Sequence, residues 1–194
     1  MSSSEATKPQ RGHPSPMMFV SIGIGTVVAI LLIGVVTYFT GGHVSKNTGL
    51  PQTALVGQKV GSFSLDSLYG GKVTSPYSAG QPTVLIFFAS YCTPCQGEMP
   101  KVATYLNTHS TGHVQVVGID ASDALGPARS FIKKDHVTFP VAFDPNNNVT
   151  TGIFQFGQIP ETVFVSAKGV VKSVYFGAIP KETLAAGIAS LNKG

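Results

Sequence analysis

The chain has 194 residues, a formal net charge of +4, two cysteines and no tryptophan; 43% of its residues are apolar and 11% are charged. Two cysteines are too few for a disulfide-rich scaffold, and a net charge of +4 without a basic cluster does not indicate a nucleic-acid-binding protein. Because a soluble domain usually carries about a quarter charged residues, part of this chain is expected to lie away from water.

The deficit of charge is concentrated near the N-terminus. Residues 17–39 contain no charged side chain, and at about 1.5 Å per residue a helix of this length spans a bilayer core of about 30 Å. The run is longer than the apolar region of a cleaved signal peptide, and no clear small-x-small cleavage site follows it. We therefore predict an uncleaved transmembrane signal anchor, with a cleaved signal peptide and a buried core helix as alternatives.

The flanks of this segment indicate its orientation. Lys8 and Arg11 precede it, and this slim excess of positive charge favours a cytoplasmic N-terminus. Residues 1–16 are rich in polar residues and are predicted to be a disordered cytoplasmic tail. Residues 40–55, rich in Gly, Ser, Thr and Asn, are predicted to be a linker. Residues 56–194 remain, enough for one well-buried core.

Strand-like and helix-like runs alternate along residues 56–194. The run from Thr83 to Ala89 is β-branched and aromatic without polar alternation, which is typical of a strand buried on both faces of a sheet. A helix should begin near the cysteine pair that follows and should be kinked by Pro100. Further strands are predicted over 113–119, 139–143, 162–166 and 170–176, and further helices over 125–136, 149–154 and 181–191. This order predicts an α/β fold with a mixed sheet.

The chemistry of the chain is concentrated in Cys92-Thr93-Pro94-Cys95. Two thiols three residues apart at the start of a helix lie within bonding distance, and the positive end of the helix dipole stabilises a thiolate there. Thiols of C-x-x-C motifs at helix starts titrate at about 3.5 to 7.5, below the usual value of about 8.5. Cys92 is therefore the predicted nucleophile and Cys95 the buried resolving thiol.

Three other uses of the cysteine pair stay open. A zinc site needs four ligands, and His109 and His113 form the one histidine pair with suitable spacing. A structural disulfide would close a very short loop and would stabilise the fold little through chain entropy. A c-type haem attachment site requires C-x-x-C-H, and Gln96 stands where the histidine would be.

Several spaced motifs resemble those of one protein family. They are VGQKVGSFSL at the start of the body, FFASYCTPCQGEMP around the cysteines, then VVGID, FIKKDHVTFPVAFDP and GQIPETVFVSAKGVV. Together they resemble the membrane-anchored thiol-disulfide oxidoreductases of the TlpA, ResA and CcmG (DsbE) type. The resemblance implies a thioredoxin-like fold with a mixed central sheet flanked by helices, an inserted helix and strand, and one N-terminal transmembrane helix.

The resemblance also implies roles for single residues. Cys92 and Cys95 match the redox pair, and Pro100 matches the proline that kinks the first helix. Ile159-Pro160 matches a cis-proline loop that packs beside the disulfide and offers backbone groups to the substrate; an ordinary trans proline opening a strand is the alternative. Glu98 matches an acidic residue that tunes the thiols and accepts a proton as a mixed disulfide resolves. A first-turn Glu stabilised by the helix dipole fits the same position.

Two positions depart from the pattern of the family. Tyr91 stands where a tryptophan usually precedes the motif, which keeps an aromatic wall but changes its shape and adds a hydroxyl group. Ile86 occupies the strand position at which thioredoxin itself has a buried acid. One proton relay is therefore absent, and Glu98 becomes the nearer candidate.

These features predict a single-pass protein of the bacterial cytoplasmic membrane with its catalytic domain on the extracytoplasmic side. The expected substrates are disulfides of exported proteins such as apocytochrome c, reduced with electrons from a membrane redox donor; an oxidising direction stays open. The exchange chemistry needs no cofactor or metal, and no nucleic-acid partner is expected.

Two other classes of function are weighed against this prediction. A peroxiredoxin-like peroxidase would share the fold and an early cysteine, but the P-x-x-x-T-x-x-C pattern is missing. A Cu(I)-binding module could use the two thiolates as soft ligands. Met99 is the one methionine near the pair, however, and it fits a core position better than a ligand position.

Overall fold

The computed structural model describes residues 52–194. The predicted tail over 1–16, the signal anchor over 17–39 and most of the linker over 40–55 lie outside the described residues. Within residues 52–194, no helix combines the length and the apolar character needed to cross a membrane. The described residues include all of 56–194, the part of the chain that remains after the predicted linker.

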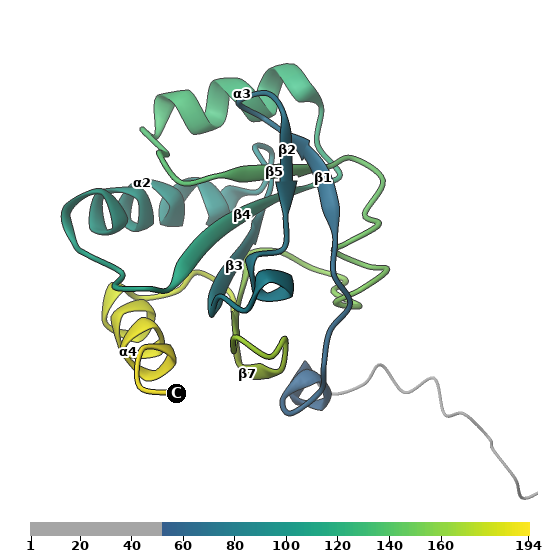
Figure 1. The fold of residues 1–194 in the computed structure, drawn as a ribbon. Coiled ribbons are helices and arrows are strands. Elements are labelled where there is room, and N and C mark those ends of the chain that lie inside the picture. Colours follow the sequence, from purple (N-terminus) through teal and green to yellow (C-terminus); the bar gives the residue numbers. More distant parts are fainter. Residues whose placement is uncertain (1–51) are drawn as a thin grey trace, which may run out of the picture. The chain divides into compact units, whose positions relative to one another are not determined.

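The body is built on a seven-stranded mixed sheet (Figure 1). Its strands in chain order are β1 (Ser64–Ser67), β2 (Lys72–Thr74), β3 (Thr83–Phe88), β4 (Gln115–Ala121), β5 (Val141–Asp144), β6 (Glu161–Val165) and β7 (Val171–Phe176). They lie in the order β2-β1-β5-β4-β3-β6-β7. Strands β3, β4 and β5 run parallel to one another, and every other neighbouring pair is antiparallel. The predicted mixed sheet is confirmed.

Three α-helices share one hydrophobic core on a single face of this sheet: α2 (Thr93–Thr108), α3 (Leu125–Lys134) and α4 (Lys181–Leu191). Side chains of β3 alternate between the two faces. Ile86 and Phe88 pack with the helices, whereas Leu85 and Phe87 pack on the other side. Because both faces are covered, every residue of β3 is buried, as its uninterrupted apolar run predicts.

The opposite face is covered by irregular segments and not by an α-helix, so α-helices flank the sheet on one side only within the described part of the chain. The connection from β5 to β6 supplies Phe154 and Phe156, whose rings meet the Phe87 ring edge to face at centroid distances of 5.1 and 5.0 Å. The short 3₁₀ helix η2 (Pro76–Ala79) lies on this side and buries Tyr77.

Residues 149–154, predicted as a short helix, form a series of turns. The Asp144 carboxylate accepts hydrogen bonds from the backbone N–H groups of Val149 and Thr150 and from the Thr150 hydroxyl. These bonds fold the chain back on the end of β5. The backbone bonds that follow reach four, five and six residues back, as in Phe156 N–H to the Thr150 carbonyl, so no regular helix forms.

The hairpin of β1 and β2 was not predicted. Its strands contain four and three residues, too few for an alternating pattern to stand out. The resemblance implied an inserted helix and strand, which are α3 and β5. Strand β1 pairs with β5, so the hairpin extends the sheet beyond this insertion. The 3₁₀ helix η1 (Gln52–Leu55) contacts β7, so the folded body begins slightly before residue 56.

Helix α4 has the bounds that its sequence pattern predicts, and Leu184, Ile188 and Leu191 form its buried face. It approaches β6 closely at Gly187. A methyl group placed on Gly187 would come within 2.1 Å of a ring carbon of Phe164. This glycine therefore sets the distance between the helix and the sheet.

Candidate active site

The two cysteines lie where β3 ends and α2 begins. Cys92 is the N-cap residue of α2, and the backbone N–H of Cys95 donates to its Sγ atom at 3.2 Å. The pair forms a disulfide, with Cα atoms 5.2 Å apart. Helix α2 continues through Pro100 for 16 residues in all, so both sulfur atoms lie at the positive end of its dipole.

The two sulfur-bearing residues differ in access. Cys95 is fully buried, whereas Cys92 exposes 7% of its surface. Thr93 and Pro94 between them are exposed. A protein that approaches this turn of the helix therefore meets Cys92 first, which fits the predicted order of nucleophile and resolving thiol.

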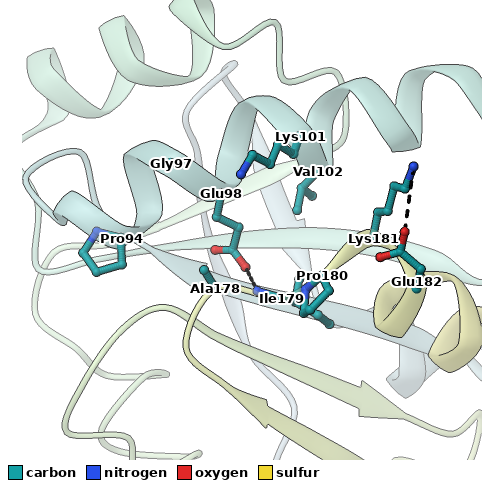
Figure 2. Close-up of a pocket in the computed structure, with 10 residues that line it drawn as sticks. All are labelled: Pro94, Gly97, Glu98, Lys101, Val102, Ala178, Ile179, Pro180, Lys181 and Glu182. Carbon is teal, nitrogen blue, oxygen red and sulfur yellow. Dashed lines mark hydrogen bonds and ion pairs between the residues drawn. The ribbon is translucent and has the colours of Figure 1, made fainter.

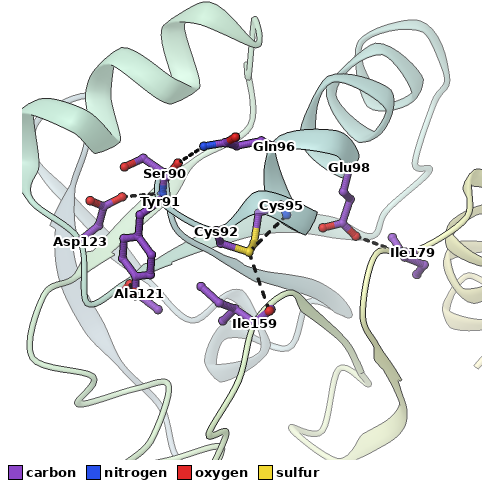
Figure 3. The surroundings of a disulfide bond; sticks show 10 residues. All are labelled: Ser90, Tyr91, Cys92, Cys95, Gln96, Glu98, Ala121, Asp123, Ile159 and Ile179. Atoms are coloured by element: carbon purple, nitrogen blue, oxygen red, sulfur yellow. Dashed lines mark hydrogen bonds between the residues drawn. A yellow bond between two sulfur atoms is a disulfide. The ribbon is translucent and has the colours of Figure 1, made fainter.

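A loop from the other side of the sheet flanks the disulfide (Figure 3). The Ile159–Pro160 peptide bond is cis, as the resemblance implies, and the Ile159 carbonyl oxygen lies 3.8 Å from Sγ of Cys92. Pro160 is buried and leads directly into β6. Tyr91 is 60% exposed, with its hydroxyl 3.5 Å from the carbonyl oxygen of Ala121. Cys92 thus lies between an aromatic side chain and an accessible backbone edge.

Glu98 lies one helical turn past Cys95 and is only 2% exposed. Its Oε1 atom accepts a hydrogen bond from the Ile179 N–H at 2.6 Å, and Oε2 has no hydrogen-bond partner among the described residues. Burial raises the pKa of Glu98 from 4.5 to about 7, although the bond from Ile179 acts in the opposite direction. A surface carboxylate stabilised by the helix dipole would have a lowered pKa, so burial dominates here.

The Glu98 side chain also borders a cavity of about 550 Å³ between α2 and the segment that leads into α4 (Figure 2). Pro94 and Pro180 contribute apolar walls, and Lys101 and Lys181 add two cationic side chains. Pro94 belongs to the C-x-x-C motif, so the motif itself contributes to the wall of this cavity.

Two further buried carboxyl groups lie at the same end of the sheet, and the sequence analysis did not identify either as a site residue. Asp120 in β4 and Glu161 in β6 are paired with the last residues of β3. Burial raises the pKa of Asp120 to about 8, with nearby carboxyl groups adding to the rise, and raises the pKa of Glu161 to about 7. An acid that directly follows an apolar strand, as in VVGID, is the signal that could have identified Asp120.

The disulfide lies in the position typical of a thioredoxin-like protein. A strand buried in the sheet delivers the C-x-x-C pair to the start of a helix, and a cis-proline loop flanks it. A family model described as the AhpC/TSA family matches residues 56–174. This chain therefore belongs to the AhpC/TSA family.

Similar proteins agree with this class. The chain is 24% identical over 160 residues to thiol-disulfide oxidoreductase ResA of Bacillus cereus, covering 81% of this chain and 89% of the relative. It is 23% identical over 160 residues to sporulation thiol-disulfide oxidoreductase A of Bacillus subtilis, covering 81% and 92%. A secreted Mycobacterium tuberculosis disulfide oxidoreductase, described as homologous to E. coli DsbE, matches in structure with a TM-score of 0.59 at 24% identity, covering 66% of this chain and 96% of that one. The predicted thioredoxin-like fold with a mixed sheet and helices is confirmed, as is the predicted resemblance; the transmembrane helix predicted over 17–39 lies outside the described residues.

Proposed function

We propose that this chain catalyses thiol-disulfide exchange on protein substrates outside the cytoplasm, with Cys92 as nucleophile and Cys95 as resolving thiol. The observation that carries this proposal is the disulfide at the accessible N-terminus of α2, beside the Ile159 carbonyl group. Relatives named as thiol-disulfide oxidoreductases, matched over most of both chains, support the same activity.

The reaction begins from the reduced pair. The Cys92 thiolate attacks one sulfur of a substrate disulfide, forming a mixed disulfide and releasing one substrate thiolate. The Cys95 thiolate then attacks Sγ of Cys92, which releases the second substrate thiolate and forms the internal disulfide seen here. Two electrons pass to the substrate. Full burial of Cys95 keeps this second thiol away from other disulfides until the mixed disulfide has formed.

Glu98 is suited to take up the proton that Cys95 must lose before it attacks. Its carboxyl group has a pKa of about 7 and lies one turn along the same helix, and its Oε2 atom is not occupied by a hydrogen bond from the described residues. A base whose pKa lies near the working pH is present in its basic form and still holds a proton effectively. Replacing Glu98 by Gln should slow resolution of the mixed disulfide by about 10².

The cis-proline loop supplies a backbone contact for the substrate. The carbonyl group of Ile159 faces Cys92 and belongs to a half-buried residue, so an extended substrate segment can donate an N–H to it while its cysteine reaches Cys92. Backbone contacts of this kind are independent of the substrate's side chains. This suits an enzyme that acts on several unfolded proteins.

We assign the reducing direction to the couple. An oxidant such as DsbA owes its strength to stabilisation of its reduced form, whereas a carboxylate beside the thiols disfavours the thiolate. Glu98 is such a group in the first turns of α2. A reduction potential near about −270 mV for the Cys92–Cys95 couple would support a reductase, and one near about −120 mV an oxidant.

The location and partners follow from the sequence. The apolar run over 17–39 and the positive charges before it support a single-pass anchor in the bacterial cytoplasmic membrane with the body outside. A reductase there requires a membrane donor of electrons, and apocytochrome c is a candidate substrate. A reporter that is active only in the cytoplasm, fused to the C-terminus, should give no signal; a signal would refute this topology.

The exchange function is tested with the full chain in detergent and a disulfide-containing protein substrate. Cys92→Ser should abolish reduction of the substrate. Cys95→Ala should stop at the first step and accumulate a mixed disulfide that a non-reducing gel detects. Thr108→Ser, at the far end of α2, removes no thiol and serves as control. Full activity of the Cys92→Ser variant would contradict the proposal.

Two further measurements separate this function from the two others considered from the sequence. Consumption of peroxide without exchange on protein disulfides would identify a peroxidase; the residue three positions before Cys92 is Ala89, which lacks the hydroxyl group of the peroxidase pattern. Stoichiometric Cu(I) binding without exchange would identify a copper-binding module. Met99 is fully buried in the core, which accounts for it without a role as ligand.

A further inference from the structure

The short connection between β3 and Cys92 is held by side chains from outside it. The backbone N–H of Ser90 donates to Oδ2 of Asp123 at 2.6 Å, and Nε2 of Gln96 donates to the Ser90 carbonyl oxygen at 2.7 Å (Figure 3). The N–H of Cys92 donates to the Ala89 carbonyl oxygen at 3.2 Å. The two peptide groups that flank Ser90 are thus fixed from both sides, and with them the position of the nucleophile.

Asp123 reaches this connection from the loop between β4 and α3, 33 residues away in sequence. Its second oxygen, Oδ1, accepts a hydrogen bond from the N–H of Ala124 at 2.7 Å. Both oxygens of Asp123 therefore serve as hydrogen-bond acceptors, one for the active-site connection and one for the start of α3.

Asp120 lies next to Asp123 and has a different environment. It is fully buried, its carboxyl group is within hydrogen-bonding reach of that of Asp123, and among the described residues no N–H or O–H group donates to either of its oxygens. The carboxyl group of Asp144 in β5 adds to the negative environment of Asp120, but it lies one register position away, opposite Ala121, and accepts hydrogen bonds from Thr150 and its neighbour. On the side of β3, Asp120 is paired with the apolar Phe88.

Both oxygens of Asp123 already accept N–H groups, whereas neither oxygen of Asp120 does, so a proton shared between these two residues belongs on Asp120. Two carboxylates cannot hydrogen-bond to each other, whereas a neutral carboxyl group can donate to a carboxylate. We propose that Asp120 is a positioning residue: in its neutral form it donates a hydrogen bond to the Asp123 carboxylate and so holds Asp123 on the Ser90 N–H in front of Cys92. The proposal rests on the exchange function proposed above and adds a residue that places its nucleophile.

This arrangement makes the active-site connection sensitive to pH. Burial, together with the neighbouring carboxylates of Asp123 and Asp144, raises the pKa of Asp120 to about 8. For such a group the protonated fraction falls from about 97% at pH 6.5 to about 3% at pH 9.5. Above this range two adjacent carboxylates repel each other, and Asp123 is pushed away from Ser90.

The experiment follows the Ser90 amide by NMR in the oxidised full chain in detergent. In the oxidised protein the two cysteines are bonded and do not titrate, so the thiols cannot move this signal. We expect the Ser90 resonance to shift between pH 6.5 and 9.5 with a midpoint near 8. Its protection against hydrogen exchange should fall about tenfold over the same range as the charge-assisted bond is lost.

Two variants identify the group that titrates. Asp120→Asn keeps a donor for Asp123 and cannot ionise, so the shift and the loss of protection should both disappear. Glu98→Gln removes a different buried acid and should leave the Ser90 midpoint unchanged. A Ser90 signal that is flat in the wild-type chain overturns the proposal whether or not the variants fold, and so does a shift that persists in Asp120→Asn.

Exchange activity distinguishes this proposal from the broader one. The ratio of the Asp120→Asn rate to the wild-type rate should rise at least about threefold from pH 6.5 to 9.5, because thiol ionisation affects both proteins equally. A constant ratio overturns the role of Asp120 while exchange itself stands. Absence of exchange at every pH refutes the proposed function instead, and the Ser90 titration in the oxidised chain still decides whether Asp120 holds this connection.

Discussion

Replacing Glu98 by Gln tests whether a buried carboxyl group destabilises this domain at neutral pH. Glutamine has the same shape and keeps an acceptor for the Ile179 N–H, which Oε1 of Glu98 binds at 2.6 Å. The substitution therefore removes the ionisable group without opening a cavity. What it changes is the response of the folded state to pH.

The magnitude follows from the rise in pKa from 4.5 to about 7. At about 1.4 kcal/mol for each unit of pKa, this corresponds to about 3 kcal/mol. Between these two values the folded protein holds a proton that the unfolded chain has lost. The free energy of unfolding of the wild type therefore falls as the pH rises from about 4.5 to about 7, and no further contribution from Glu98 is lost above that range.

The assay is denaturant unfolding of the oxidised protein at a series of pH values from about 4.5 to about 8.5. The stability of Glu98→Gln relative to wild type should increase by about 3 kcal/mol across this range, because the other buried acids titrate in both proteins and cancel in the difference. Glu182→Gln, at the border of the same cavity and 73% exposed, should show no such trend. Parallel curves for Glu98→Gln and wild type would refute the reasoning.

Three further predictions concern the scaffold. Gly187→Ala should destabilise the domain by about 1 to 3 kcal/mol because the added methyl group would overlap the Phe164 ring. Gly126→Ala in α3 is the control: no atom lies within 4 Å of the added methyl group, so it should be neutral or stabilising. Thermal unfolding compares the two variants. Asp144→Ala leaves the N–H groups of the following turn without an acceptor and should cost about 2 to 4 kcal/mol by the same measurement; a loss below about 1 kcal/mol would contradict the role of Asp144. Reduction of the active-site disulfide opens a loop of only about four residues and should lower stability by about 2 kcal/mol, so circular dichroism should show a folded reduced domain.

The elements that the sequence predicts best are those with a strong local pattern. The apolar run of β3 and the spacing of Leu184, Ile188 and Leu191 in α4 required no knowledge of the rest of the fold. The cysteine pair belongs to the same class, because a C-x-x-C motif at the start of a helix is defined within one turn. Local signals of this kind are enough to predict that both sulfur atoms lie at the start of α2.

The elements that the sequence does not predict depend on distant partners. The 149–154 segment has helical spacing, but the Asp144 carboxylate, five and six residues before its bonding partners, draws the backbone into turns. The burial of Asp120 requires the neighbouring strands β3 and β5, which lie on both sides of it in the sheet and in sequence. No hydrophobic periodicity or sequence motif indicates that Asp123, in the loop after β4, contacts Ser90. The hydrogen bond that holds the active-site connection could therefore not be predicted without the fold.

The charges around the disulfide act against each other in a way that depends on pH. The N-terminus of α2 favours the Cys92 thiolate at every pH. Glu98 and Glu161 both have pKa values of about 7, so they are largely neutral near pH 6 and become negative as the pH rises through this range. Each added negative charge disfavours a thiolate nearby. These charges therefore oppose the effect of the helix dipole on the thiolate. A strong oxidant depends on the opposite effect, stabilisation of its reduced form, so this arrangement supports the reducing direction proposed for the couple.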